Sequence, residues 1–284
     1  MNTNSKIKNF VARSLFAMTL LLVPVYSANA QSGDDEFGIW GTFEFSKKIN
    51  KKAKFVIDAE IRSVEAVSNV ERLVVGAKLD YKIIDWLKAN AGYCFIYGHT
   101  LNETSIKDIV DENLNLYDYN VDDDYWASRN RFYLSLTGEC KVGRFEISLR
   151  ERLQYTRTGS ATTNETKYRL RLDEDDEPVF DKEGAPIYDI ESGPEFKEAK
   201  NNLSLRSRLS VKYDIPKCKV TPFVSAELYT RLDKLKGYDK LRCRAGASYK
   251  INKKNSVSLY YLYQDVSGDD PDGHAIGLEY SIDL

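Results

Sequence analysis

Histidine and cysteine are scarce in this chain, with two histidines and four cysteines among 284 residues. Four cysteines are too few for the disulfide framework of a small secreted domain, and two histidines make a transition-metal site unexpected. We therefore expect no cofactor and no metal. Neither charge dominates, since 41 Lys and Arg face 43 Asp and Glu, whereas nucleic-acid-binding proteins are usually basic. No nucleic-acid partner is expected.

Long apolar runs are also lacking, but the first thirty residues resemble a secretory signal peptide. Three basic residues precede a short apolar run over residues 15–23, and small residues end the segment at Ala30. The alternative, an uncleaved membrane anchor, is disfavoured because the run is short for a ~30 Å membrane and Pro24 interrupts it. We predict a cleaved signal peptide over 1–30 and an exported mature chain over 31–284.

Apolar and polar residues alternate along almost the whole mature chain. Strict alternation predicts strands with one apolar and one polar face, and no stretch shows helical periodicity. Many of the runs have ~10–15 residues, whereas soluble strands usually have ~5–6. The eleven runs lie at residues 37–45, 55–62, 73–81, 87–97, 126–138, 145–155, 203–213, 220–232, 241–251, 257–263 and 276–284.

The connections alternate in length between short turns and long loops. The short ones lie near residues 49–52, 83–85, 141–143, 214–217 and 252–255, and the long ones near 63–69, 98–124, 159–199, 233–237 and 267–273. This segregation is typical of a transmembrane antiparallel up-and-down β-barrel with short periplasmic turns and long extracellular loops. The fold class is therefore predicted to be all-β, with outer-membrane localisation. An exported soluble β-protein is the alternative.

Strand parity and one acidic residue are less well explained by this barrel. Bacterial single-chain barrels normally have an even number of strands, so within a range of 10–12 strands we expect ten or twelve rather than eleven. Glu151 falls in the apolar phase of its run, between Leu149 and Leu153. It either faces lipid, which is unfavourable, or is turned inward by a bulge.

Aromatic residues are expected to form two girdles at the membrane interfaces. Tyr81, Trp86, Tyr213, Tyr249 and Tyr280 lie near short turns, and Trp126, Tyr155, Tyr229 and Tyr261 lie nearer the long loops.

Several stretches also carry a family resemblance. They are Phe37-Gly38-Ile39-Trp40 through Ala59-Glu60-Ile61-Arg62, Trp86-Leu87-Lys88-Ala89-Asn90-Ala91-Gly92-Tyr93, Arg131-Phe132-Tyr133-Leu134 and Leu149-Arg150-Glu151-Arg152-Leu153. The chain resembles the uncharacterised outer-membrane β-barrel family called domain of unknown function 2490, over nearly all of residues 36–284. The resemblance implies an outer-membrane barrel and supplies no activity. Leu284 departs from the aromatic residue that often ends such chains.

An Arg-x-Arg pattern recurs on four of the polar faces. It comprises Arg129 and Arg131, Arg150 and Arg152, Arg206 and Arg208, and Arg242 and Arg244. Residues two apart share a strand face, so each pair points into the lumen if the apolar face meets lipid. The first three pairs lie on consecutive strands and are expected to stack. Carboxylates in the same phase are Asp58, Glu60, Glu139, Glu146, Glu227 and Glu279.

The arginines favour a narrow porin-like channel for anionic small solutes, because guanidinium groups stay charged and bind carboxylates in bidentate fashion. The alternative is a closed, salt-bridged barrel that acts as a structural or surface-binding module through its acidic loops. Residues 101–124 contain eight Asp and Glu against one Lys, and residues 173–177 are all acidic. Such loops are expected to be solvated; Ca²⁺ binding is the weaker interpretation.

Catalysis is not expected, because His99 and His274 carry no recognised motif. The expected partners are outer-membrane lipid and lipopolysaccharide. The barrel-assembly machinery is expected to recognise the C-terminal strand, 276–284. The cysteines Cys94, Cys140, Cys218 and Cys243 are expected to be isolated thiols.

Overall fold

The computed structural model describes residues 36–64, 69–100, 102–111, 116–233, 238–267 and 273–284. The predicted signal peptide lies outside these residues. The described chain is all-β, and it contains no helix long and apolar enough to cross a membrane. Its strands are β1 (Glu36–Lys48), β2 (Ala53–Val64), β3 (Asn69–Ile84), β4 (Leu87–Thr100), β5 (Glu103–Asp111), β6 (Leu116–Asp122), β7 (Tyr125–Val142), β8 (Phe145–Thr158), β9 (Ala161–Leu170), β10 (Tyr188–Lys197), β11 (Lys200–Tyr213), β12 (Val220–Arg231), β13 (Lys240–Lys250), β14 (Asn255–Val266) and β15 (Gly273–Asp283).

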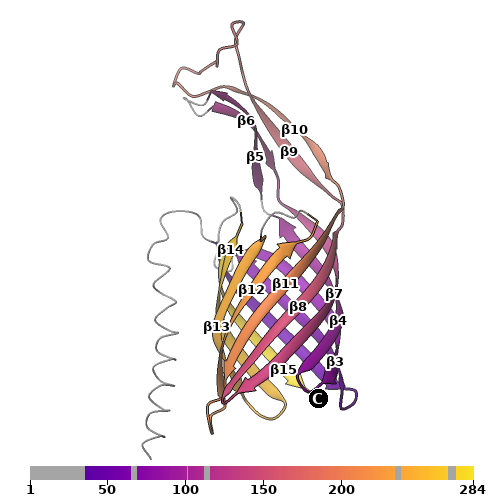
Figure 1. The fold of residues 1–284 in the computed structure, drawn as a ribbon. Coiled ribbons are helices and arrows are strands. Elements are labelled where there is room, and N and C mark those ends of the chain that lie inside the picture. The colour runs from indigo at the N-terminus through magenta and orange to yellow at the C-terminus, as the bar shows by residue number, and fades with distance from the viewer. Residues whose placement is uncertain (1–35, 65–68, 101, 112–115, 234–237, 268–272) are drawn as a thin grey trace, which may run out of the picture.

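Eleven of these strands form a closed barrel, in the order β1-β15-β14-β13-β12-β11-β8-β7-β4-β3-β2 (Figure 1). The prediction of a barrel with 10–12 strands is confirmed, but the expectation of an even number is wrong. Neighbouring strands run antiparallel except at the closure, where β1 pairs parallel with β15 from Glu36 opposite Gly273 to Ser46 opposite Asp283. An odd number of alternating strands makes the first and last run in the same direction, so only a parallel pair can close this barrel.

The other four strands form a second sheet, in the order β10-β9-β6-β5, beyond the end of the barrel opposite the C-terminus (Figure 1). The two longest connections, 98–124 and 159–199, were expected to be loops, and this expectation is wrong over β5, β6, β9 and β10. β9 and β10 pair in continuous register from Leu170 opposite Tyr188 to Ala161 opposite Lys197. β9 is polar at most positions, so alternation of hydropathy does not reveal it. β6 and β10 do alternate, since Tyr117, Tyr119 and Val121 share one face of β6 and Tyr188, Ile190 and Phe196 share one face of β10. We call this sheet the extension sheet.

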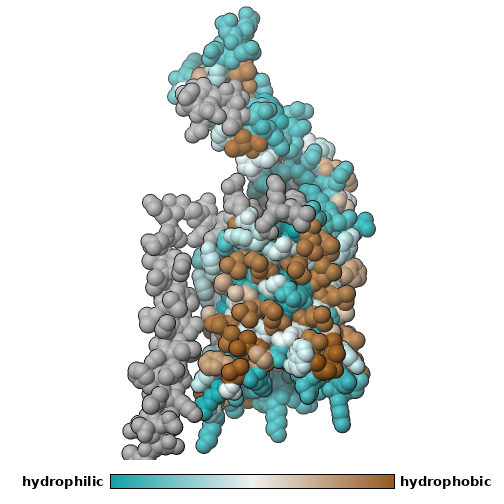
Figure 2. Space-filling view, viewed as in Figure 1, coloured by the Kyte–Doolittle hydropathy of each residue, from teal (hydrophilic) through white to brown (hydrophobic). Residues whose placement is uncertain are grey.

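The outer wall of the barrel is apolar. Large side chains such as Val75 and Leu134 are 58% and 63% exposed, and Figure 2 shows a hydrophobic band around the visible wall with hydrophilic residues at both ends. An apolar surface this continuous is unfavourable in water. It matches the lipid-facing band of a transmembrane barrel, which confirms the predicted fold class.

Glu151 interrupts this apolar wall. β8 pairs with β7 and β11 without a bulge, so Glu151 lies opposite Leu136 and Ser207 on the outward face. Of the two alternatives left by the sequence, the outward one is correct. The Ser207 hydroxyl donates a hydrogen bond to Glu151 Oε2 at 2.6 Å, which partly satisfies the carboxylate.

The interior is filled in part by apolar and aromatic side chains. Trp40, Tyr260, Leu262 and Ala275 form a buried cluster, against which Phe223 packs. Gly277 is required beside it, because a Cβ there would lie 2.0 Å from the ring of Tyr260. These contacts fix the spacing of β1, β14 and β15, the strands next to the closure.

Candidate functional site: an arginine cluster in the lumen

All eight arginines singled out from the sequence lie on the inner face of the barrel. β7, β8 and β11 are neighbours, as predicted, and the register places Arg152 opposite Arg206 and Arg150 opposite Arg208. β12 separates these strands from β13. We use the name arginine cluster for Arg129, Arg131, Arg150, Arg152, Arg206, Arg208, Arg242 and Arg244.

Glu227 on β12 is the carboxylate at the centre of this cluster. It lies opposite Arg208 on one side and Arg242 on the other, and only 2% of it is exposed. Its oxygens accept hydrogen bonds from Arg150 at 2.5 Å, Arg206 at 3.0 Å and Arg208 at 3.5 Å. One negative charge is therefore shared among three guanidinium groups.

Most of the remaining polar contacts of the cluster are to neutral groups. Arg131 donates to Thr156 Oγ1 at 3.2 Å, and Arg152 donates to Ser135 Oγ at 3.0 Å. The guanidinium of Arg152 also lies 4.1 Å from the ring centroid of Tyr133. Hydroxyl and aromatic partners orient guanidinium groups, but they do not cancel their charge.

Tyr229 has the same orienting role on β12. It was expected in an interfacial girdle, and this prediction is wrong, because the alternation of β12 puts Tyr229 in the same inward phase as Glu227. Its ring lies 4.4 Å from the Arg206 guanidinium, and its hydroxyl accepts a hydrogen bond from Arg242 at 2.7 Å.

Three cations at the end of the lumen that faces the extension sheet were missed from the sequence. Arg62 on β2, Arg72 on β3 and Lys240 on β13 lie near the ends of their strands that face the extension sheet. Arg62 pairs with Glu60 at 2.7 Å, and Arg72 pairs with Glu71 at 2.6 Å. The alternation that revealed the Arg-x-Arg pairs also assigns Arg62 and Arg72 to the inner face, but a search restricted to paired arginines passes over them.

Positive charge exceeds negative charge in this part of the lumen. Among the described residues, ten arginines and Lys240 face five carboxylates, those of Glu60, Glu71 and Glu227, with Asp58 near Arg152 and Glu279 near Arg208 and Arg244. Six of the arginines also have a buried Nε with no hydrogen-bond partner among the described residues. They are Arg72, Arg129, Arg150, Arg206, Arg208 and Arg242. The protein thus leaves donor capacity and charge for an anion or for water.

Two carboxylates that were candidates to neutralise the cluster pair with lysines nearer the short turns instead. Glu139 binds Lys88 at 2.7 Å, and Glu146 binds Lys212 at 3.3 Å. Positive and negative side chains are therefore matched near this end, whereas the cluster is not neutralised.

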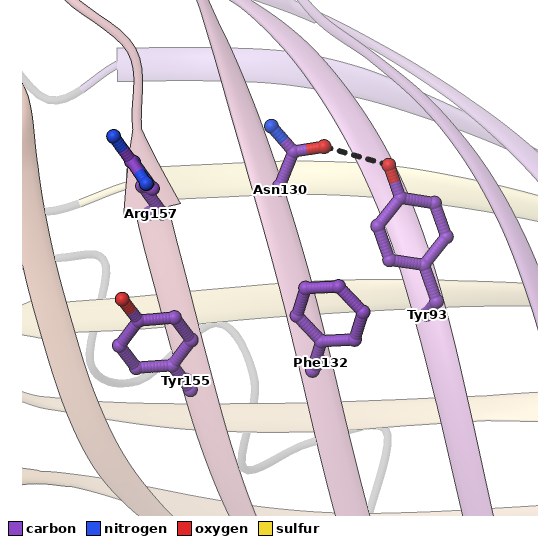
Figure 3. A pocket seen from close by; sticks show the side chains of 5 residues that line it. All are labelled: Tyr93, Asn130, Phe132, Tyr155 and Arg157. Atoms are coloured by element: carbon purple, nitrogen blue, oxygen red, sulfur yellow. Dashed lines mark hydrogen bonds between the residues drawn. The ribbon is translucent and has the colours of Figure 1, made fainter.

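A depression of about 660 Å³ lies on the outer wall, across β4, β7 and β8. Figure 3 shows Tyr93, Asn130, Phe132, Tyr155 and Arg157 around it, and the Tyr93 hydroxyl donates to Asn130 Oδ1 at 2.7 Å. The polar groups gather on one side of the rings, an arrangement suited to a membrane interface. This depression faces away from the lumen and is separate from the arginine cluster.

Each histidine contacts a residue outside the cluster, although His274 also lines a cavity that Arg242 borders. His99 contacts Asp124 at 2.6 Å and stacks on Trp126, and His274 contacts the hydroxyl of Tyr261. The four cysteines are free thiols, as predicted.

Comparison with known proteins identifies a family. A family model described as "Protein of unknown function (DUF2490)" matches residues 37–274, which confirms the resemblance found in the sequence. One similar solved structure is the β-domain of the Bordetella autotransporter BrkA, with 11% identity, 82% coverage of each chain and a TM-score of 0.43. Another is the CymD monoaromatic hydrocarbon channel, with 10% identity, 81% coverage of this chain, 83% of that chain and a TM-score of 0.29. No curated protein matches the chain.

Proposed function

We propose that this chain, which belongs to the DUF2490 family, forms a narrow pore for small anions in the outer membrane, with the arginine cluster as its selectivity region. The observation that carries the proposal is the unmatched positive charge around Glu227. The apolar wall supports insertion in a bilayer, and the export signal expected at residues 1–30 supports the outer membrane as its destination.

The lumen is suited to anions for electrostatic reasons. Like charges held close together in a confined space of low dielectric repel strongly, so an anion between them is stabilised. Water reaches the ionic side chains along the lumen, since Arg208 is 25% and Lys88 is 44% exposed at the side chain. A barrel of this size lies between the filled interior of ~8 strands and the open channel of ~16, which agrees with a narrow pathway.

The test is ion selectivity in planar lipid bilayers, measured as the reversal potential in a KCl gradient. Refolded mature protein should conduct and prefer chloride over potassium. The double variant Arg131→Gln/Arg152→Gln should lower that preference severalfold, because it removes two charges that form no hydrogen bond to Glu227. Lys253→Gln/Lys254→Gln removes two charges from an exposed turn and should change nothing. A non-conducting or cation-selective protein contradicts the proposal.

A second candidate function is supported by the extension sheet. It stands beyond the barrel end, and its strands expose large apolar side chains at Ile106, Ile190 and Phe196. A sheet with apolar groups exposed to water suits a surface-binding module, with lipopolysaccharide or another protein as partner. In that case the barrel itself serves as an anchor and does not conduct.

A further inference from the structure

A cavity of about 140 Å³ lies inside the barrel, at the end that faces the extension sheet. Its lining comes from both sides of the β1–β15 closure and from β13. The lining includes Trp40, Arg62, Glu71, Arg72, Lys240 and Arg242. At ~30 Å³ per water the cavity has room for about four or five waters, or for one small organic ion.

The charged residues of this lining are unequal in sign. Four are cations, namely Arg62, Arg72, Lys240 and Arg242, and among the described lining residues Glu71 is the sole carboxylate. Glu71 is bound to Arg72 at 2.6 Å. Glu60, which neutralises Arg62, does not line the cavity. The cavity therefore holds a net positive charge within reach of any bound molecule.

Trp40 orients two of these cations, Arg62 and Arg242. The Arg62 guanidinium lies 3.8 Å from its ring centroid, and the Arg242 guanidinium lies 4.8 Å from it. An aromatic face attracts a cation without neutralising it, and it restricts the plane of the guanidinium. Trp40 is itself held in the buried cluster with Tyr260 and Leu262, so the ring is a rigid support.

Arg242 is also held in place by two hydrogen bonds. Its Nη1 donates to the Tyr229 hydroxyl at 2.7 Å, and its Nη2 donates to Gln264 Oε1 at 2.5 Å. Its Nε and that of Arg72 have no partner among the described residues. Both guanidinium groups are thus oriented in advance while their donors outnumber the protein acceptors, which is the arrangement that favours a bound oxyanion.

We propose that this cavity is a binding site for one small dianion of the carboxylate or phosphate class. This site rests on the proposed function, since it belongs to the same cationic lumen. It would bind an anion at the mouth of the pathway. Its small volume favours anions of a few carbons, and its net positive charge disfavours cations.

Binding can be followed by the fluorescence of Trp40. The chain has three tryptophans, so Trp40 is the single remaining one in the variant Trp86→Phe/Trp126→Phe. Refolded protein in detergent is titrated with succinate, with inorganic phosphate and with putrescine as the cationic control. Succinate, phosphate or both should quench Trp40 fluorescence saturably, and the two titrations decide between the carboxylate and phosphate sources. Putrescine should have no effect.

Three variants are expected to change the affinity for the anion in different ways. Arg72→Gln should weaken anion binding by about tenfold or more, because a charge-assisted hydrogen bond is lost. Glu71→Gln should strengthen binding severalfold, because the repulsive carboxylate is removed; a misfolded protein would not show this gain. Lys212→Gln removes a lumenal charge at the opposite end and should leave affinity unchanged. Equal affinity in all three variants, or no saturable quenching by either anion, overturns the site.

The proposal of a pore and the proposal of a binding site can be contradicted independently. A chloride-selective conductance without saturable binding retains the pore and eliminates the site. Saturable binding in a protein that does not conduct retains the site and eliminates the pore.

Discussion

Glu227 is the residue on which the arrangement of the cluster depends most directly. Its arginine partners are Arg150 on β8 and Arg206 and Arg208 on β11, so it links three strands, β8, β11 and β12, around one buried charge. Removing one partner of a buried ion pair leaves an uncompensated charge and is more damaging than removing both. Here a single carboxylate has three such partners.

We therefore predict that Glu227→Gln lowers the free energy of unfolding by about 3–5 kcal/mol. The measurement is urea unfolding of the refolded protein in lipid vesicles, followed by tryptophan fluorescence. Glu146→Gln is the matched control, because its side chain is 34% exposed and its lysine partners lie at the short-turn end. It should cost less than about 1 kcal/mol. Equal losses in the two variants would show that Glu227 has no special role.

At the scale of the element, the extension sheet is held by aromatic contacts in place of a large apolar core. Tyr119 on β6 stacks on Tyr168 of β9 with ring centroids 4.5 Å apart, and Tyr188 of β10 meets Tyr119 edge-on at 5.5 Å. Lys197 of β10 also binds Asp122 of β6 at 2.7 Å, across the intervening strand β9. Burial of the phenol groups and the neighbouring tyrosines raise the pKa of Tyr119. Burial, Tyr117 and Asp118 raise that of Tyr188.

These raised pKa values predict that the extension sheet loses stability at alkaline pH. The folded sheet keeps the phenol protons to a higher pH than the unfolded chain does. The stabilisation is therefore complete below the pKa of an unfolded tyrosine, about 10, and is lost as the pH rises through the higher folded values. Tyrosinate absorbance during a pH titration should show a late-ionising component.

That component should become smaller in Tyr119→Phe/Tyr188→Phe and keep its size in Tyr125→Phe, which alters a tyrosine of the barrel strand β7. If the double variant titrates like the parent protein, the cluster does not control the stability of the sheet.

At the scale of the whole molecule, the barrel and the extension sheet are separable by their pairing. β8 and β11 pair in register from Lys200 opposite Thr158 to Tyr213 opposite Phe145, so the wall is complete without β9 and β10. Deleting residues 161–197 leaves a four-residue connection between Thr158 and Lys200. That length is ordinary for a hairpin.

We predict that this deletion variant still forms the barrel and retains the chloride preference of the full chain. Folding is checked by the mobility shift of unheated against heated samples in gel electrophoresis, and selectivity by reversal potential. Any binding of lipopolysaccharide by the surface module should be lost, which separates the two candidate functions. Failure of the shortened chain to fold would show that the extension sheet is part of the barrel's folding unit.

Much of the barrel was predictable from local patterns. The alternation of Phe55, Ile57 and Ile61 with Asp58 and Glu60 determines which side chains share a face, because that period of two depends only on backbone geometry. The same reasoning placed the Arg-x-Arg pairs in the lumen and showed that three of them are adjacent. The extension strand β9 was missed because it is polar at most positions, whereas β6 and β10 do alternate but lie inside segments rich in Asp and Glu that suggested loops.

What the sequence determined by itself is thus the all-β class, the inside-out polarity and the arginine-rich lumen, since each follows from residue order along single strands. The tertiary structure alone decided the parallel closure of β1 on β15, the sharing of Glu227 among three arginines, and the cavity around Trp40. These depend on cross-strand register and on which of several carboxylates comes within hydrogen-bond distance. Every strand pairing around the ring contributes to those distances, so no single segment contains the information.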